Sequence, residues 1–398
     1  MYEKLREPAG DEILQLASAF REDARPEKLD FGIGVYRDAL GNTPVMRAVK
    51  SAEWSLVRDE MSKSYLGLTG DERFNARLLE LMLGNHLSQR IRAVQTPGGG
   101  GAVRLIAEFI RAATPQATVW IGTPTWINHR PIMDHVGLNV RQYDYLDRRS
   151  QTVDFDQMMG QFAHAARGDI VLLQGCCHNP SGADLSVVQW SEIAELANRL
   201  GFVPFIDLAY QGFGGGLEAD AIPLRLVAER VPELLIAASC SKNFGLYRER
   251  VGCAAVLARN PLEADLAKST LASLARVNYS FPPSHGASVV RTVLEIPELK
   301  TTWVEELEEM RQRLLSNRLA LARALRAKTD SERFDFIITQ RGMFSLLGIT
   351  PDQVQELRQD YAIFMPSESR INIAGLQPKS IERLADALQT VTQRRRLK

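Results

Sequence analysis

Ser-Lys-Asn-Phe-Gly-Leu-Tyr at positions 241–247 sets a single lysine among small and polar residues. Residues 234–238, just upstream, are uniformly apolar and predict a short buried strand. Lys242 would then lie at the end of a strand, where an α/β sheet commonly presents its chemistry. A lysine in that position can form an imine with an aldehyde cofactor and later act as a base, once its pKa falls below the ordinary value of about 10.4.

Arg250 follows Lys242 along the chain and could hold an anionic tail of the same cofactor. For an isolated pair of this kind, a solvated loop lysine beside a structural arginine is the commoner explanation. The significance of the pair therefore depends on the rest of the chain.

Composition limits the class of protein. The chain has 398 residues, of which 45% are hydrophobic and 24% charged, so it can bury a large core and is expected to form two domains. Its 48 basic residues balance 48 acidic ones, and no global field favours nucleic acid or an anionic membrane. No apolar run approaches the ~20 residues of a membrane span, and the first residues lack a signal peptide's apolar core. We expect a cytoplasmic protein without nucleic-acid or membrane partners.

Four cysteines in so long a chain give no disulfide framework. Cys176 and Cys177 are adjacent and, on a strand, would point to opposite faces. We interpret them as buried thiols. His178 does not complete a zinc site, because no second Cys/His pair lies at ligand spacing, so no metal is expected.

Helix-like and strand-like patterns alternate from about residue 95 to 260, which predicts an α/β fold with a mostly parallel sheet covered on both faces. The predicted strands are 118–122, 169–174 and 202–207, and a helix at 187–199 ends at Leu200-Gly201.

The flanking segments suggest the rest of the fold. An amphipathic helix is expected from Asp11, its plausible cap, to Asp23, and a long helix from Glu298 to about Lys328. Segments 334–339, 344–347 and 370–374 are expected to form the small sheet of a second domain, followed by a helix at 379–396.

Thr-Pro-Gly-Gly-Gly-Gly-Ala at 96–102 precedes an apolar-periodic helix at 103–113. Exposed backbone N–H groups and a helix N-terminus favour an anion, so this segment could seat a phosphate. A flexible turn explains the glycines equally well, and neither nucleotide-binding glycine signature is present.

Polar and aromatic side chains follow the predicted strands. Asp207 ends an apolar strand, where a carboxylate invites a cationic partner such as a protonated pyridine nitrogen. Tyr210 could reach a ring oxygen and Asn179 could donate a hydrogen bond, although Asp and Asn-Pro are also common in ordinary turns. Trp126 could supply an aromatic plate. Together with Lys242, these groups suit pyridoxal 5′-phosphate.

Eight motifs follow one another along the chain: Gly-Ile-Gly-Val-Tyr at 32–36, Thr-Pro-Gly-Gly at 96–99, Cys-His-Asn-Pro-Ser-Gly at 177–182, Asp-Leu-Ala-Tyr-Gln-Gly at 207–212, Ser-Lys-Asn-Phe-Gly-Leu-Tyr at 241–247, Asn-Tyr-Ser at 278–280, Gly-Met-Phe-Ser at 342–345 and Arg-Ile-Asn-Ile-Ala-Gly at 370–375. From about residue 10 onward, the chain closely resembles the aspartate and aromatic-amino-acid aminotransferases, class I and fold type I of the pyridoxal-phosphate enzymes. The resemblance implies a large domain with a mostly parallel seven-stranded sheet between helices, and a smaller α+β domain. The implied division is an arm at 1–11, a small domain at 12–43 and 311–398, and a large domain at 44–310.

Carried over position by position, the resemblance implies that Lys242 is the Schiff-base lysine and proton shuttle. Asp207 would pair with the pyridine nitrogen and keep it protonated. Tyr210 and Asn179 would bond the ring's phenolic oxygen, and Trp126 would stack on the ring face. His129 and His178 would form supporting layers. The phosphate would be held by Gly99, Gly100, Ser239, Ser241, Arg250 and Tyr65 of the partner subunit.

The same resemblance supplies a substrate site. Arg370 would grip the substrate α-carboxylate in a bidentate pair, with Gly34 nearby. Arg276 of the partner subunit would bind the distal carboxylate of a dicarboxylate. Trp126 and Asn179 would border the substrate as well. Two residues that cross an interface imply a homodimer with shared active sites.

Some positions depart from the family pattern. Members often carry Thr or Ser where this chain has Gly100, so a backbone contact would replace one hydroxyl. Aspartate-specific members often have Asn where this chain has Phe281, which would favour an aromatic side chain if it borders the pocket. Val35, Arg37 and Thr43 instead look smaller or more polar than an aromatic-specialised pocket would prefer.

The resemblance thus implies an aminotransferase that exchanges an amino group between an aromatic amino acid, phenylalanine or tyrosine, and 2-oxoglutarate in a ping-pong cycle, with aspartate as a second donor. A narrow aspartate aminotransferase is the nearest alternative. A pyridoxal-phosphate lyase or decarboxylase is disfavoured, because a dicarboxylate clamp of Arg276 beside Arg370 suits transamination. A transcription regulator with an aminotransferase-like domain would need an N-terminal DNA-binding domain, whereas this chain is expected to enter its first domain by about residue 11.

Overall fold

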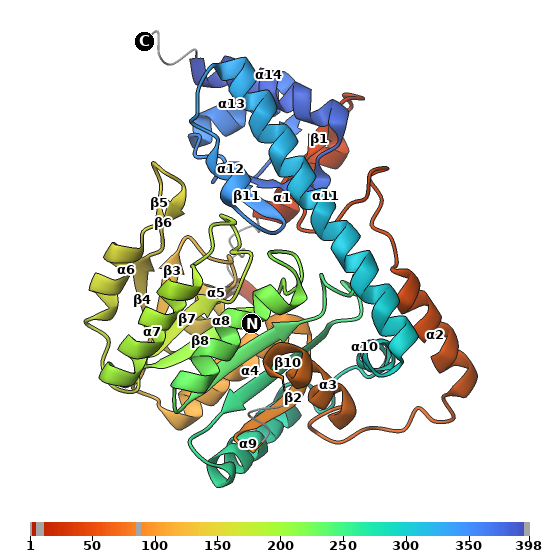
Figure 1. Cartoon of the computed structure of the whole chain (residues 1–398), viewed down its shortest axis with the longest axis vertical. Coiled ribbons are helices and arrows are strands. Elements are labelled where there is room, and N and C mark those ends of the chain that lie inside the picture. Colours follow the sequence, from red (N-terminus) through yellow and green to blue (C-terminus); the bar gives the residue numbers. More distant parts are fainter. Residues whose placement is uncertain (1, 5–11, 85–88, 394–398) are drawn as a thin grey trace.

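A seven-stranded sheet lies at the centre of the computed structural model, which describes residues 2–4, 12–84 and 89–393 (Figure 1). All neighbouring strands run parallel except β10, which is antiparallel to both of its neighbours. The predicted mostly parallel sheet is therefore confirmed. In spatial order, the strands are β2 (Ile91–Pro97), β10 (Val251–Leu257), β9 (Leu234–Ser239), β8 (Val203–Leu208), β7 (Ile170–Gln174), β3 (Thr118–Thr123) and β4 (Asn139–Asp144).

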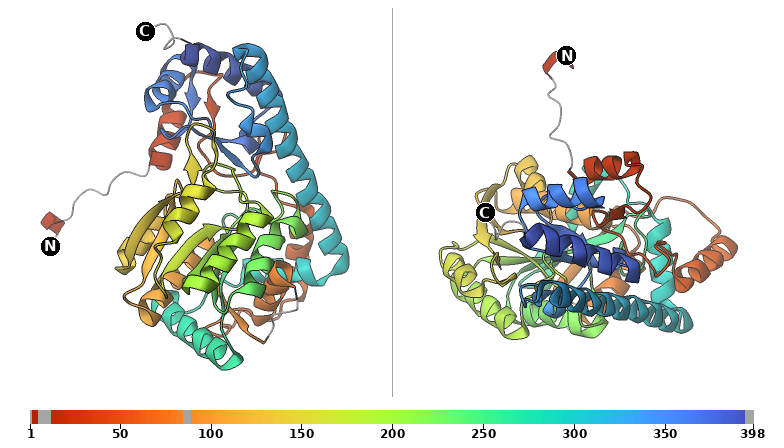
Figure 2. Two further views of the ribbon diagram at one scale, coloured as in Figure 1. Left: turned by 60° about the vertical axis from the view of Figure 1, so that its left-hand side comes forward. Right: turned by 90° about the horizontal axis from the view of Figure 1, so that it is seen from above.

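Helices cover both faces of this sheet (Figure 2). Successive strand residues point to opposite faces. Accordingly, Leu172 packs in one core with α4 (Gly98–Ala113), α5 (His129–Val136) and α9 (Pro261–Tyr279). Its neighbour Leu173 packs in the other core. The helices of that second core include α6 (Phe155–Phe162), α7 (Val187–Leu200) and α8 (Leu217–Arg230).

The long helix α11 (Pro297–Thr329) connects the sheet region to a smaller group of elements (Figure 1). It packs against α2 (Arg47–Asp59) and α10 (His285–Glu295) near one end and against α14 (Pro378–Gln393) near the other. The smaller group also contains α1 (Glu12–Glu22), β1 (Leu29–Asp30), α12 (Phe336–Thr339), β11 (Phe344–Leu346), α13 (Pro351–Tyr361), β12 (Ile363–Phe364) and β13 (Arg370–Asn372). The remaining elements are η1 (Tyr2–Lys4), α3 (Glu72–Leu83), β5 (Leu146–Asp147), β6 (Thr152–Val153) and η2 (Ile373–Gly375).

The boundaries at 43/44 and 310/311 stay predictions, and the arm at 1–11 lies mostly outside the described residues. The predicted helices at 187–199 and from Glu298 are confirmed. The first predicted helix is confirmed as α1, although its proposed cap Asp11 is outside the described residues. Within the described ranges, no helix combines the length and apolarity needed to cross a membrane.

Two local predictions were wrong. Segment 334–339 was expected to be a strand, but its last four residues form the single helical turn α12. A short Phe-Ile-Ile-Thr run suits a buried helical turn as well as a strand, so its periodicity does not separate the two. The glycines from Gly98 were expected to precede a helix at 103–113, whereas they form the first turn of α4.

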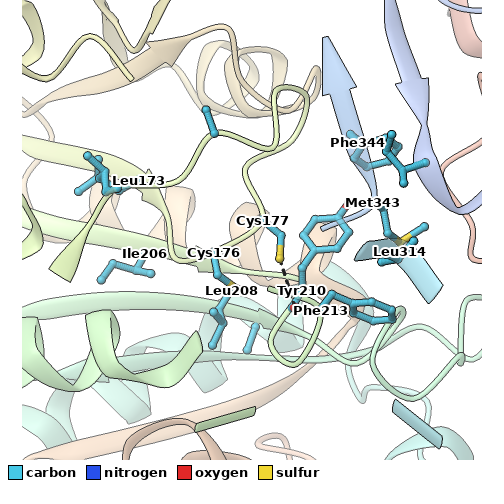
Figure 3. Packing of buried hydrophobic residues seen from close by; sticks show 14 of the residues in the cluster. Leu173, Cys176, Cys177, Ile206, Leu208, Tyr210, Phe213, Leu314, Met343 and Phe344 are labelled. Carbon is cyan, nitrogen blue, oxygen red and sulfur yellow. Dashed lines mark hydrogen bonds between the residues drawn. The ribbon is translucent and has the colours of Figure 1, made fainter. Parts of the chain in front are cut away.

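The cysteine pair also differs from expectation. Cys176 and Cys177 lie in the loop after β7 instead of on a strand, and Cys177 has a φ of +54°. Their sulfur atoms and a carboxylate oxygen of Asp220 lie within 4.8 Å of one another, so the thiols converge and do not point to opposite faces. Burial raises the pKa of the Cys177 thiol to about 12, and its sulfur lies 3.9 Å from the carbonyl oxygen of Tyr210 (Figure 3). The Asp220 carboxylate accepts backbone N–H bonds from Gly212, Gly214 and Gly215.

Arg318 on α11 anchors the segment that leads into β11. Its side chain is fully buried, and burial lowers the pKa of its guanidinium to about 9. The segment is tied in turn to the loop after β7, because the Arg341 N–H donates to the carbonyl oxygen of Gly182 at 2.8 Å. Arg318 therefore helps to fix the loop that carries Asn179. Its guanidinium donates to the carbonyl oxygens of Ile337, Arg341, Gly342 and Phe344 and to the hydroxyl of Ser345.

We predict that Arg318→Met lowers the free energy of unfolding by about 3 kcal/mol or more, because buried carbonyl groups that lose their donor cost about 1–3 kcal/mol each. Thermal melting followed by circular dichroism would measure the loss. Arg323→Met is the matched control, because Arg323 is exposed on the same helix and should change stability by less than about 0.5 kcal/mol. Equal melting temperatures for the two variants would contradict this role of Arg318.

Candidate active site

A cavity of about 320 Å³ opens at the carboxyl ends of β7, β8 and β9 and beside the first turn of α4. Its volume lies near the lower end of the roughly 300–1,000 Å³ typical of small-molecule sites. The structure therefore brings most of the predicted site into one place. The predicted residues that line the cavity are Gly34, Gly99, Gly100, Trp126, Asn179, Asp207, Tyr210, Ser239, Ser241, Lys242 and Arg250.

Lys242 follows β9, whose six residues are all buried, so the strand holds the lysine at the sheet edge. Its ammonium nitrogen lies 4.8 Å from the centroid of the Tyr210 ring. Burial lowers the pKa of Lys242 to about 8, Asp207 opposes this shift and Arg250 adds to it. More of this amine is uncharged near neutral pH than for an ordinary lysine, so it is suited to act as a nucleophile or base.

Asp207 lies near the end of β8 and is almost completely buried. Its Oδ2 atom lies 3.0 Å from Nε2 of His129, which is fully buried at the start of α5. The other ring nitrogen of His129, Nδ1, lies 2.8 Å from the hydroxyl oxygen of Thr125. A buried carboxylate is costly unless hydrogen-bonded, and this arrangement satisfies Asp207 while leaving it at the cavity wall.

The first turn of α4 forms one end of the cavity. Gly98 has a φ of +73°, and a Cβ atom there would lie 2.4 Å from Nη2 of Arg250. A Cβ atom on Gly99 would lie 2.8 Å from Cβ of Ser239, so only glycines allow this close approach. Arg250 donates to the Ser241 hydroxyl at 3.2 Å. A helix N-terminus, two hydroxyls and a guanidinium thus form a seat for an anion such as a phosphate.

Arg370 and Asn179 lie on another side of the site. Arg370 is only 9% exposed, and its Nη1 atom lies 3.4 Å from Oδ1 of Asn179. Its Nη2 atom donates to the carbonyl oxygen of Gly32 at 2.8 Å, and its guanidinium carbon lies 4.6 Å from the centroid of the Phe344 ring. The buried Nε atom has no hydrogen-bond partner among the described residues. This guanidinium retains donor capacity that suits a carboxylate.

Four predicted binding residues do not line the cavity of their own chain: Arg370, which bonds the lining residue Asn179, and Tyr65, Phe281 and Arg276. Tyr65 is 85% exposed and stacks on Phe281, with ring centroids 4.8 Å apart and an interplanar angle of 21°. The prediction that Phe281 borders the pocket is therefore not met within one chain. Arg276 is exposed near the end of α9. The placement of Tyr65 and Arg276 in a partner's site stays a prediction.

Other residues at the site carried no prediction. Asn128, Gln174, Ala209 and Tyr247 also line the cavity. The Tyr247 hydroxyl accepts the backbone N–H of Tyr36 at 2.9 Å. Gln174 is the last residue of β7, and a polar residue that ends an apolar strand is the same signal that identified Asp207.

The resemblance predicts a supporting layer for His178, which is buried and does not line the cavity. Its ring stacks on Tyr145, with centroids 4.0 Å apart, and Nδ1 bonds the Ser181 hydroxyl at 2.7 Å. Burial lowers the pKa of His178 to about 3, so the ring is uncharged near neutral pH. A neutral ring packed on Tyr145 suits the supporting part that the sequence assigned to it.

Comparison with known proteins agrees with this geometry. A family model described as aminotransferase class I and II matches residues 26–388. The aromatic-amino-acid aminotransferase of Paracoccus denitrificans is 49% identical over 98% of this chain and 99% of its own length. The aspartate aminotransferase of Salmonella typhi is 43% identical over 98% of this chain and all of its own length.

The fold is also found among solved structures. The aromatic-amino-acid aminotransferase of Burkholderia pseudomallei, covalently bound to pyridoxal phosphate, superposes with a TM-score of 0.96 at 39% identity. The match covers 98% of this chain and 99% of that one. From the family match and these near-full-length similarities, the chain belongs to the class I and II aminotransferases.

Proposed function

We propose that this protein is a pyridoxal-phosphate-dependent aminotransferase that moves an amino group between an aromatic amino acid and 2-oxoglutarate in a ping-pong cycle, with aspartate as a further donor. One observation carries the proposal: Lys242, with its pKa lowered by burial, shares a single cavity with the buried carboxylate of Asp207 and an anion seat. Relatives named for aromatic amino acids and for aspartate support the two donor classes.

The cavity fits the cofactor. The seat around Gly99 and Arg250 suits the phosphate, and the missing Cβ atoms let the first turn of α4 pack closely against Arg250 and Ser239. Asp207 would hold the pyridine nitrogen, and Asn179 and Tyr210 would bond the phenolic oxygen. When bound, the cofactor supplies an electron sink for the bonds at the substrate Cα atom.

Three side chains of the protein would have separate roles in the reaction. Nζ of Lys242 would take the proton from the substrate Cα atom and return it. The Asp207 carboxylate would pair with the ring nitrogen, and its bond to His129 fixes the orientation of the carboxylate. Arg370 would bind the substrate α-carboxylate through its unused donors.

We further propose a homodimer with shared sites, in the cytoplasm. Exposed apolar side chains on α2 and in the segment after it include Trp54, Val57, Met61 and Tyr65, each at least 70% exposed. Val277 on α9, next to Arg276, is 86% exposed. Clustered apolar exposure of this kind is typical of a surface that another protein covers. The Tyr65–Phe281 stack connects the two segments.

The first test adds glutamate, phenylalanine, tyrosine and aspartate separately to protein loaded with pyridoxal phosphate. We expect each amino acid to shift the visible absorbance of the bound cofactor. Lys242→Ala should lose this response and reduce turnover by about 1000-fold or more, because the base and imine-forming amine are removed. Lys379→Ala, an exposed lysine on α14, should behave as wild type.

A response to aspartate and glutamate alone would replace the proposal with a narrow aspartate aminotransferase. Absence of any cofactor band in the wild-type protein would contradict the proposed function altogether.

We predict that Gly100→Ser tightens cofactor binding by about fivefold, the value of one added hydrogen bond to the phosphate. A Cβ atom at Gly100 meets only Cη2 of Trp126, at an ordinary contact distance of 3.6 Å. Gly99→Ala should weaken binding instead, because its Cβ atom would lie 2.8 Å from Ser239. Equilibrium dialysis of the cofactor measures both. Tighter binding by Gly99→Ala, or no gain with Gly100→Ser, would count against this position for the phosphate.

A subunit-mixing experiment tests whether Arg276 serves the partner's site. Lys242→Ala and Arg276→Ala should each be nearly inactive with aspartate and 2-oxoglutarate. After equal amounts exchange subunits, activity should return to about one quarter of wild type, because half of the dimers are mixed and each has one intact site. No recovery in confirmed mixed dimers would show that Arg276 acts within its own chain or not at all.

A further inference from the structure

Gln174 connects the loop that carries Asn179 with the Thr125–His129 pair beside Asp207. Its side chain is buried at the end of β7. Its Oε1 atom accepts the backbone N–H of Asn179 at 2.9 Å, and its Nε2 atom donates to the carbonyl oxygen of the same residue at 2.8 Å. Nε2 also lies 3.2 Å from the hydroxyl oxygen of Thr125. The amide thus joins the Asn179 loop to the residue that bonds His129.

The main chain of Asn179 fixes the orientation of this amide. A backbone N–H can only donate and a carbonyl oxygen can only accept, so Oε1 of Gln174 must face the first and Nε2 the second. The second hydrogen of Nε2 is then directed at Thr125. The Thr125 oxygen therefore receives a hydrogen bond from Gln174.

The direction of the next bonds follows. Among the described residues, Nδ1 of His129 is the acceptor within hydrogen-bond distance of the Thr125 hydroxyl, so with one lone pair taken by Gln174 the hydroxyl donates its hydrogen to Nδ1. Nδ1 then accepts and carries no proton. Nε2 must carry the proton, and it faces the Asp207 carboxylate at 3.0 Å. In this series of hydrogen bonds, from Gln174 to Asp207, every donor then meets an acceptor.

We propose that Gln174 is a positioning residue that keeps His129 uncharged, with its single proton on Nε2 and directed at Asp207. A charged His129 would neutralise the carboxylate that the site presents to its ligand. Gln174 disfavours this, because it occupies one lone pair of the Thr125 oxygen and leaves the hydroxyl hydrogen directed at Nδ1, so a second proton on Nδ1 would displace that bond. Only the consequence for the cofactor rests on the proposed function. The protonation state itself is a property of the protein alone.

Charged or titratable side chains from three parts of the fold act on His129 or on its partner Asp207. Asp207 on β8 bonds the ring directly, and His178 in the loop after β7 interacts with it electrostatically. Lys242 after β9 interacts electrostatically with Asp207. Of these, Asp207 favours a charged ring, so a neutral His129 requires a donor at Nδ1. The Gln174–Thr125 pair supplies that donor.

Nitrogen NMR of cofactor-free protein labelled with ¹⁵N-histidine tests the proposal at neutral pH. The chain has six histidines, and His129→Gln assigns the resonances of His129. In wild type we expect one unprotonated nitrogen, Nδ1, and one protonated nitrogen, Nε2. In Gln174→Glu, a carboxylate accepts the Thr125 hydroxyl, so the Thr125 oxygen turns toward Nδ1 as an acceptor. Both nitrogens should then become protonated.

Two matched variants separate the hydrogen-bond chain from a simple charge effect. Gln174→Met removes the donor without adding charge, so the Thr125 oxygen can accept from Nδ1, and the protonated fraction of Nδ1 should rise, although less than in Gln174→Glu. Thr125→Val removes the hydroxyl, so Gln174→Glu in the Thr125→Val background should leave His129 uncharged. Melting temperatures confirm that each variant is folded.

An unchanged His129 spectrum in folded Gln174→Glu and Gln174→Met would overturn the proposal. So would protonation of Nδ1 by Gln174→Glu in the Thr125→Val background, since a charge effect does not need the hydroxyl. In cofactor-loaded enzyme, Gln174→Glu should lower kcat about tenfold and Gln174→Met less. If the protein binds no cofactor, the proposed function fails while the NMR result still decides the part played by Gln174.

Discussion

The buried carboxylate of Asp207 is the constraint on which the site depends. An isolated charge inside a protein is expensive, so its surroundings must supply partners. His129 provides one at 3.0 Å, and the charge also acts on the buried amine of Lys242. These residues come from β8, α5 and the loop after β9, so a single charge requires three elements to converge. The parallel sheet makes this convergence possible, because its carboxyl ends meet at one edge.

A second set of contacts joins this edge to the smaller group of elements. Arg318 lies on α11 and holds the backbone that leads into β11, while Arg370 on β13 reaches Asn179 beside the cavity. The ring of Phe344 lies next to the Arg370 guanidinium. It also lies next to the ring of Tyr210 (Figure 3). The side of the site that carries Arg370 therefore depends on the packing of α11 as well as on the sheet.

The sequence could predict charged residues that stand at or just after the end of an apolar strand, where packing alone does not explain a charge. Asp207 stands out because it ends an apolar run, and Lys242 because it follows one after three small residues. Gln174 ends a strand in the same way, but an uncharged amide is common in turns and carried no prediction. Phe336–Thr339 fits a strand or a helical turn equally, and only tertiary contacts decide between them. The Tyr65–Phe281 stack joins segments far apart in sequence, and no local pattern reveals such a pair.

That stack has a consequence for assembly. Immobilising an exposed aromatic side chain at an interface ordinarily costs conformational entropy at the moment of binding. Tyr65 is already held against Phe281 within the single chain, although it remains 85% exposed. An approaching second copy would meet a side chain whose rotamer is already selected. In the proposed homodimer, Phe281 would then influence the strength of association by preorganising Tyr65.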